Sequence, residues 1–202
     1  VQSGSDQVLQ AMNRGYTAAE FERIVAALRE ARPDIALSSD FITGFPGESE
    51  AAFEETLALV ERVGFAQSFS FKYSPRPGTP GAILPQQVKD AVRGQRLLRL
   101  QSVLGRQAAD FNARTVGRVV PVLFERPGRH AGQLVGRTPY LQAVHVQADG
   151  AVLGEVHEVL ITAAFPHSLA GRLHRRAADA DRQIAVAAGH GQGPAQPEET
   201  FA

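Results

Sequence analysis

Hydrophobic residues in the first third of the chain recur at helical spacing and then at strand spacing, and this order of patterns occurs twice. Thr17 and Glu20 form a capping box before an apolar stripe at helical spacing, and Pro33 marks the end of that helix. The pattern then predicts a strand over residues 35–43, a helix over residues 50–63 and a strand over residues 65–73. Helix, strand, helix, strand with short connections is typical of parallel α/β units.

Each of the two predicted strands has a polar side. In the second strand Phe69 and Phe71 alternate with serines and Lys72, and in the first strand Asp40 alternates with Phe41. Helices that cover a sheet need an apolar face beneath them, so we expect the aromatic side under the helices and the polar side toward a barrel interior. Closed barrels fill that interior with branched apolar residues. The polar side therefore predicts an open, water-filled lumen that holds a polar ligand.

The pattern changes again in the second half of the chain. Residues 86–113 carry leucines on one helical face and arginines on the others, which predicts a long helix that bridges two domains. After it, short Val/Leu-rich segments separated by Gly, Pro or Asp predict the five strands of a small antiparallel barrel of the OB type. The segments are residues 116–124, 134–135, 141–146, 152–161 and 168–173.

The fold class predicted from these patterns is α/β, an open (β/α) barrel portion followed by a small antiparallel β-barrel. From Arg175 the chain is rich in Ala, Gly and Gln, and we predict a disordered tail there. We assign residues 1–84 to the barrel portion, 85–114 to the bridging helix, 115–174 to the β-barrel and 175–202 to the tail.

Composition and charge narrow the choice of function. The 202 residues include no cysteine, which excludes disulfides, zinc ribbons and iron–sulfur ligation by this chain. No apolar run approaches the ~20 residues of a membrane span and no signal peptide is visible, so we expect a cytoplasmic protein. Residues 115–176 carry seven arginines against four acids, and residues 177–202 one arginine against four acids. The basic block suggests a polyanionic partner, with ordinary scatter of surface charge as the alternative.

Three loops follow predicted strand ends, where active sites of parallel α/β layers gather. They are residues 2–5, 43–48 and 74–80. Gly4, Gly44 and Gly47 would let the backbone approach a ligand, and Glu48 and Arg76 are charged groups placed to grip hydroxyls or a carboxylate. Each loop alone could equally be a plain turn.

The barrel-like second half offers an RNA-binding surface but no catalytic group. The segment 136–140 places an arginine, a hydroxyl and an aromatic ring in one turn, and further arginines surround it in the sequence. Arginines neutralise phosphates and aromatic rings stack on unpaired bases, although a solvated basic face would look the same. The five histidines of this half lack metal-like spacing, and no nucleophile–base pair is visible in the chain.

Several motifs together resemble one family, the radical SAM methylthiotransferases, and within it the MiaB-type tRNA 2-methylthio-N6-dimethylallyladenosine synthases. The motifs are Val1-Gln-Ser-Gly-Ser5, Met12-Asn-Arg-Gly-Tyr16, Ser39-Asp-Phe-Ile-Thr-Gly-Phe-Pro-Gly-Glu48, Phe69-Ser-Phe-Lys-Tyr-Ser-Pro-Arg-Pro-Gly-Thr-Pro80, Gly136-Arg-Thr138 and Ser168-Leu-Ala-Gly171. The resemblance implies the C-terminal part of an open radical SAM barrel followed by a TRAM domain. It also implies S-adenosylmethionine (SAM) and two [4Fe-4S] clusters as cofactors. The implied reaction forms a 5′-deoxyadenosyl radical and adds a methylthio group to C2 of N6-dimethylallyladenosine beside the tRNA anticodon.

The resemblance also carries roles to individual residues. Gln2, Ser3 and Ser5 are implied to lie beside SAM. In the next loop Asp40, Thr43, Gly44, Gly47 and Glu48 are implied to border its ribose and adenine, with Asp40 where the family often has glycine. Ser74 and Arg76 are implied to meet the adenine edge. Arg137, Thr138 and Tyr140 are candidates for RNA contact, with Arg118 and Arg172 supplying further positive charge.

The chain lacks the cysteines on which the chemistry of the resembled family depends. Those cysteines would lie upstream of Val1, so we expect the C-terminal portion of an enzyme that is inactive by itself. The expected partner is the anticodon stem-loop of tRNA, with no membrane contact and a monomeric state. Two alternatives stay open: an RNA-binding module without catalysis, and a RimO-type methylthiotransferase that acts on a ribosomal protein.

Overall fold

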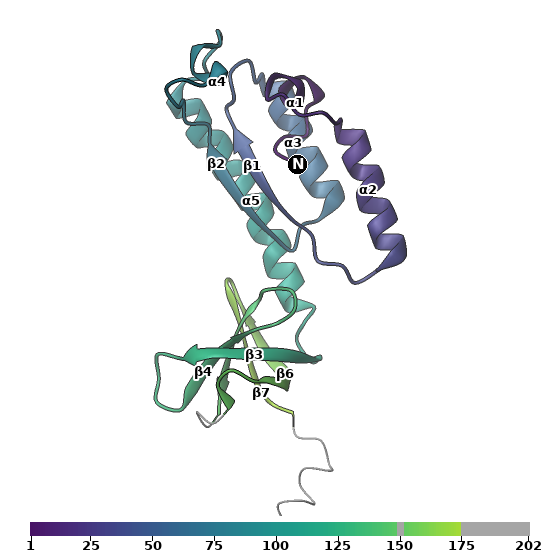
Figure 1. Cartoon of the computed structure of the whole chain (residues 1–202), viewed down its shortest axis with the longest axis vertical. Helices are drawn as coiled ribbons and strands as arrows, with labels where there is room; N and C mark the ends of the chain where they lie inside the picture. Colours follow the sequence, from purple (N-terminus) through teal and green to yellow (C-terminus); the bar gives the residue numbers. More distant parts are fainter. Residues whose placement is uncertain (149–151, 175–202) are drawn as a thin grey trace, which may run out of the picture. The chain divides into compact units, whose positions relative to one another are not determined.

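The computed structural model describes residues 1–148 and 152–174, and the predicted tail lies outside the described residues. The chain divides into two compact units (Figure 1). Among the described residues, the first contains Val1–Val116 and Ala164–Ser168, and the second contains those of Gly117–Ala163 and of 169–174. In the described part of the chain no helix is both long and apolar enough to cross a bilayer. The domain limits proposed from the sequence stay predictions.

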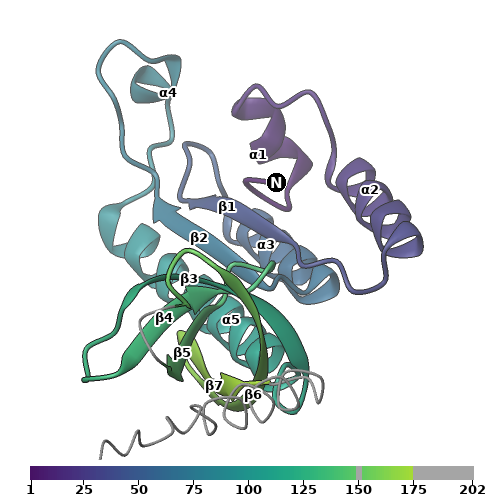
Figure 2. The ribbon, with the colours of Figure 1, turned by 60° about the horizontal axis from the view of Figure 1, so that its bottom comes forward.

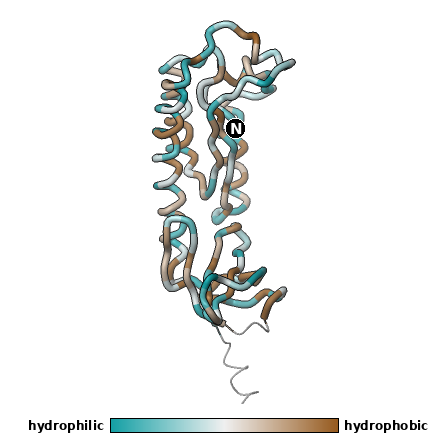
Figure 3. Tube along the Cα trace, turned by 90° about the vertical axis from the view of Figure 1, so that its left-hand side faces the viewer, coloured by the Kyte–Doolittle hydropathy of each residue, from teal (hydrophilic) through white to brown (hydrophobic). Residues whose placement is uncertain are grey.

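The first unit confirms the predicted order of helix, strand, helix and strand. Its two strands are parallel neighbours, and helices α3 and α5 lie against one side of them (Figure 1). The elements are α1 (Asp6–Ala11), α2 (Ala18–Ala31), β1 (Ser38–Thr43), α3 (Glu50–Val63), β2 (Gln67–Lys72), α4 (Pro80–Ile83) and α5 (Asp90–Ala113). Hydrophobic and hydrophilic residues alternate along the helices of this unit (Figure 3), as amphipathic elements around one core require.

Local signals in the sequence explain where the helices begin and end. The Thr17 hydroxyl accepts the Glu20 amide and the Glu20 carboxylate accepts the Thr17 amide, so the predicted capping box is confirmed. Gly64 ends α3 with a left-handed φ of 63°. Beneath the strands Phe41, Phe53, Leu59, Leu100 and other apolar residues form the core of this unit.

The two faces of the sheet differ from the prediction in β2. The parallel register sets Asp40 opposite Phe69, and paired residues face the same side. Phe41 is fully buried under the helices, whereas 57% of Phe69 and 54% of Phe71 is exposed. The prediction that the aromatic side of β2 faces the helices is therefore wrong. Phe41 and the leucines of α5 already fill the space under the helices, so the β2 aromatics lie with Asp40 on the open face.

The second unit is a closed barrel with the strand order β3-β4-β5-β7-β6 (Figure 2). Its strands are β3 (Val119–Pro127), β4 (Gln133–Arg137), β5 (Ala143–Gln147), β6 (Val156–Phe165) and β7 (Ser168–Leu173), although the residues where β6 turns into β7, Ala164–Ser168, group with the first unit. Inward residues alternate along the strands, as with Val120, Val122 and Phe124 of β3. The predicted fold class is confirmed, although β5 and β7 pair in parallel and several strands begin a few residues later than predicted.

Candidate functional site

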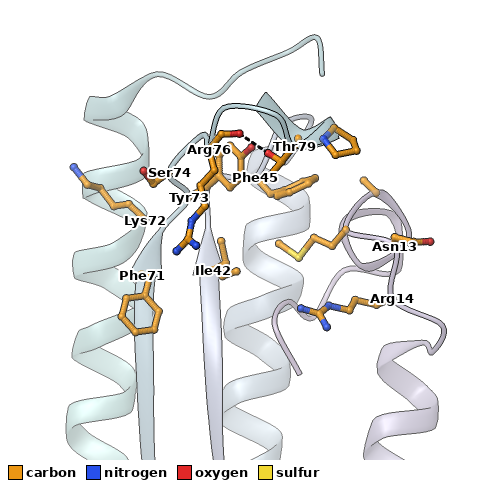
Figure 4. Close-up of a pocket in the computed structure, with 14 residues that line it drawn as sticks. Asn13, Arg14, Ile42, Phe45, Phe71, Lys72, Tyr73, Ser74, Arg76 and Thr79 are labelled. Carbon is orange, nitrogen blue, oxygen red and sulfur yellow. Dashed lines mark hydrogen bonds between the residues drawn. The ribbon is translucent and has the colours of Figure 1, made fainter. Parts of the chain in front are cut away.

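A cavity of about 740 Å³ opens in the first unit where the parallel strands end (Figure 4). Three segments line it: the end of α1 with the turn after it (residues 11–14), the end of β1 with the loop after it (Ile42 and Phe45), and β2 with the segment from its end to the start of α4 (residues 71–81 in part). Separate strand ends therefore do meet around one cavity, as expected for a parallel α/β layer.

The cavity combines apolar surface with positive charge. Met12, Ile42 and Phe45 supply apolar surface, and the rings of Phe45 and Tyr73 meet edge to face with centroids 5.0 Å apart. Figure 4 shows Arg14 and Arg76 reaching toward the space beside Ile42 from different loops. Within residues 1–148 and 152–174 neither guanidinium forms an ion pair with a carboxylate. The arrangement suits a ligand with a planar ring at one end and an anionic group at the other.

The loop after β2 reaches the cavity as the sequence suggested. Ser74 and Arg76 both line it, and the Thr79 hydroxyl donates to the Arg76 carbonyl at 2.7 Å, which closes the turn that presents Arg76. Asp40 lies exposed on the open face of β1, on the same side as Ile42. Thr43 is buried and its hydroxyl donates to the Phe71 carbonyl at 3.5 Å, so it joins the strand ends.

The first predicted loop shapes the unit without lining the cavity. Ser3 is fully buried and its hydroxyl lies 3.0 Å from that of Thr56, and Ser5 is also buried. Gln2 accepts a hydrogen bond from the Tyr16 hydroxyl at 2.9 Å. A Cβ on Gly4 would lie 2.5 Å from the Glu55 carbonyl oxygen, so the close approach at this glycine is to α3 and not to a ligand.

Residues of the turn after α1 take the place that we expected for the first loop. Met12, Asn13 and Arg14 line the cavity, and Asn13 holds a left-handed φ of 56°. The segment Met12–Tyr16 carries part of the family resemblance, but no role was predicted for its residues. An arginine next to an asparagine, a residue that tolerates this backbone shape, was the available signal.

Glu48 turns inward, which revises its predicted role as a ligand-gripping charge. The side chain is almost fully buried, and its Oε2 accepts from the Gly44 amide at 2.7 Å and from Arg96 Nη1 at 2.8 Å. Burial raises the pKa of Glu48, against the lowering effect of the Gly44 and Arg96 hydrogen bonds. Gly47 donates its amide to the Gln86 carbonyl at 3.0 Å with a φ of 83°. Both residues fix the loop that carries Phe45.

Acid should weaken the first unit through Glu50, which lies between Arg96 and Arg99. Burial alone would raise the pKa of Glu50, but hydrogen bonds from the two arginines outweigh it and lower the pKa below its ordinary 4.5. A lowered pKa in the folded state adds stability above the ordinary value and loses it as the pH falls through the folded value. Between about pH 5 and pH 3, the free energy of unfolding should therefore fall by about 0.5 kcal/mol more in wild type than in Glu50→Gln.

Urea unfolding at several pH values, with Glu30→Gln as an exposed control, would measure this difference. The raised pKa of Glu48 acts in the opposite sense, since it favours the protonated folded state. The Glu50 charge is the smallest of its causes, so this contribution is largely common to both proteins and mostly cancels. Parallel pH profiles for wild type and Glu50→Gln would contradict the prediction.

The predicted RNA-binding residues all lie in the second unit, but they differ in exposure and in how firmly hydrogen bonds hold them. Arg118 and Arg172 are exposed, and Arg137 is exposed but held by Glu125 at 3.2 Å and by the Leu141 carbonyl at 3.2 Å. Thr138 is buried, and its hydroxyl accepts the amides of Tyr140 and Gln142 at 3.2 and 3.3 Å. Thr138 therefore shapes the turn that presents Arg137 and Tyr140.

Comparisons with known proteins agree with both units. Residues 1–60 match the radical SAM superfamily and residues 113–174 match the TRAM domain. The tRNA-2-methylthio-N(6)-dimethylallyladenosine synthase of Maricaulis maris (strain MCS10) is 57% identical over 173 residues, which cover 86% of this chain and 38% of the relative. The synthase of the same name from Erythrobacter litoralis (strain HTCC2594) is 54% identical over 173 residues, which cover 86% of this chain and 39% of the relative.

The chain thus spans 38 to 39% of the length of these curated relatives. The two family matches include the turn after α1, the end of β1 with its loop, and the whole described barrel, but not β2 and the loop after it. This chain belongs to the MiaB-type radical SAM methylthiotransferase family.

Proposed function

We propose that this chain is part of an enzyme that methylthiolates tRNA, in which the first unit contributes to the SAM site and the barrel binds the tRNA. The observation that carries the proposal is the cavity at the strand ends, in a chain 57% identical to a named tRNA-modifying synthase. Both relatives are named as synthases of a methylthiolated adenosine in tRNA, which favours RNA over a ribosomal protein as the substrate. The target in this proposal is C2 of N6-dimethylallyladenosine next to the anticodon.

The cavity residues fit SAM. Phe45 and Tyr73 offer ring surface for the adenine, and Arg14 or Arg76 would pair with the carboxylate of the methionine part. Ser74 in the cavity lining would hydrogen-bond a hydroxyl, and Asp40, exposed two residues before Ile42 on the same face of β1, is the proposed second partner. When bound, SAM would supply the methyl group and, with a reduced iron–sulfur cluster, the radical chemistry of the family.

The remaining predicted cofactor residues act in this proposal from behind the cavity. Their hydrogen bonds and backbone contacts hold the loops in place. These residues are Gln2, Ser3, Ser5, Thr43, Gly44, Gly47 and Glu48. The chain has no cysteine and so offers no thiolate to a cluster, and the two clusters expected for the intact enzyme stay a prediction. The monomeric state stays a prediction. So does the cytoplasmic location, the compartment in which the chain would encounter tRNA.

Binding to RNA should depend on salt and on the exposed arginines of the barrel. We expect Arg118→Ala to reduce the slope of log K against log salt concentration by about 0.7 to 0.9 for an anticodon stem-loop, because one phosphate contact is lost. Fluorescence anisotropy at several salt concentrations would measure the slope. Arg23→Ala is the matched control, because Arg23 is an exposed arginine of α2 in the first unit. A wild-type slope of zero would refute phosphate binding by the barrel.

The reaction itself needs the intact enzyme. Mass spectrometry of tRNA nucleosides and of ribosomal peptides, after incubation with that enzyme, should show the added methylthio group on the nucleoside alone. Modified peptides with unmodified nucleosides would support the RimO-type alternative. Binding of the stem-loop without either product would support an RNA-binding module that lacks catalysis.

A further inference from the structure

We propose that Arg93 and Arg96 of α5 are positioning residues that set the shape of the cavity by holding both of its strand-end loops. Neither side chain lines the cavity, and in the part of the chain that the structure describes no residue of α5 does. The two arginines act through Gly44, Glu48 and Tyr73. The inference rests on the proposed function, because it assigns their effect to SAM binding.

Arg96 fixes the loop after β1. Only 6% of the residue is exposed, and its Nη1 donates to the Glu48 carboxylate at 2.8 Å and to the Glu48 carbonyl at 2.9 Å. The same carboxylate oxygen accepts the Gly44 amide at 2.7 Å. One carboxylate therefore connects a helix of the core to the backbone amide just before Phe45. A charged and buried pair with these geometries is short and directional.

The rest of the Arg96 guanidinium is also anchored. Nε and Nη2 donate to Glu50 at 3.2 and 3.1 Å, and the group lies 5.6 Å from the centre of the Phe53 ring. A lysine at this position could contact one carboxylate but could not reproduce the fork that reaches both. The loop after β1 thus depends on the shape of the side chain as well as on its charge.

Arg93, one helical turn earlier, contacts both loops. Its Nη1 donates to the Tyr73 carbonyl at 2.6 Å, which fixes the beginning of the loop after β2. Its aliphatic part packs against Gly44, where a Cβ would overlap Cγ of Arg93 and lie 2.8 Å from Cδ. Asp90 holds the same guanidinium at 3.3 Å and accepts Lys72 at 3.0 Å. Arg93 therefore spaces the Gly44 backbone from that of Tyr73.

This spacing decides one wall of the cavity. Phe45 follows Gly44 directly, and its ring meets the ring of Tyr73 to form the apolar wall described above. If either arginine is lost, the two rings are free to shift relative to each other. Displacements of about 1 Å at such sites can change function by about 100-fold, because ring stacking and ion pairing both depend on position.

The test uses the full 202-residue chain and S-adenosylhomocysteine, a SAM analogue that lacks the sulfonium methyl group. We expect Arg96→Met and Arg93→Met each to raise the Kd measured by calorimetry by about tenfold or more. Arg106→Met is the control, because Arg106 is on the same helix but pairs with Glu61 at the surface. Arg96→Lys should fail to restore affinity. Unchanged affinity in folded Arg93 and Arg96 variants would overturn the proposal.

Amide hydrogen exchange separates this inference from the proposed function. Gly44 should lose protection in Arg96→Met at a temperature where circular dichroism shows the variant to be folded, while amides of the barrel keep theirs. If Arg96→Met does not fold, Arg93→Met and Arg96→Lys supply the same comparison. Suppose that the wild-type chain binds no analogue, while the Gly44 amide loses protection in the variants. This result would refute the cofactor site and support the loop-positioning role. Unchanged Gly44 protection would refute that role.

Discussion

Replacing Gly44 with alanine is expected to lower the free energy of unfolding of the first unit by about 3 kcal/mol, and replacement with valine by more. The left-handed φ of 76° costs an L-residue about 1–2 kcal/mol. The new Cβ would also overlap Arg93 and force that side chain away from Tyr73, and overpacking of this kind costs about 1–3 kcal/mol. Urea unfolding followed by nuclear magnetic resonance signals of the first unit would measure the loss.

Gly78 provides the matched control for Gly44. It has a similar φ of 81°, but no atom lies within 4 Å of a Cβ built on it. Gly78→Ala should therefore cost only the backbone term of about 1–2 kcal/mol. Equal losses for the two alanine variants would show that Arg93 does not pack on Gly44 as described. Gly44 was predicted to let a ligand approach the backbone, whereas the structure places Arg93 against it.

Replacing Gly136 with valine should unfold most of the barrel and abolish RNA binding. A Cβ at Gly136 would overlap the Leu123 carbonyl oxygen and lie 2.5 Å from Val122 Cγ1, on the neighbouring strand β3. A backbone carbonyl cannot rotate away without breaking the β3–β4 pairing, so we expect a loss of about 3 kcal/mol or more. Domains of this size have total stabilities of about 3–9 kcal/mol, at roughly 0.05–0.15 kcal/mol per residue.

Separate signals from the two units would measure this loss, with the first unit as an internal reference. Gly154→Ala is the control in the barrel, because its φ is 81° and its surroundings are open, so it should cost about 1–2 kcal/mol. A Gly136→Val barrel with wild-type stability would contradict the close strand approach at this glycine.

The order of elements could be predicted because its causes are local. The capping box at Thr17, the glycine stop at Gly64 and the alternation of β3 depend on residues a few positions apart in the chain. The loop of residues 74–80, picked out by its place after a predicted strand, does line the cavity with Ser74 and Arg76, and its role toward a cofactor stays a prediction. For these features the nearby sequence contains the physical information that decides the structure.

The covered face of β2 could not be predicted in the same way. Alternation shows that a strand has two sides, but not which side a helix will cover. That side depends on α5, whose leucines pack beneath Phe41 from far along the chain. Glu48 is a similar case, since only its partner Arg96, 48 positions later, shows that the carboxylate is buried in an ion pair.

Residue identities alone determined that this chain offers no thiolate to a metal cluster, that its helices and strands alternate, and that it resembles one enzyme family. The tertiary structure decided which residues face the cavity: Arg14 and Phe45 do so, while Ser3 and Glu48 are buried behind it. The physical reason is that periodicity and capping act over a few residues. Burial and ion pairing across elements depend on contacts that exist only once distant segments have packed together.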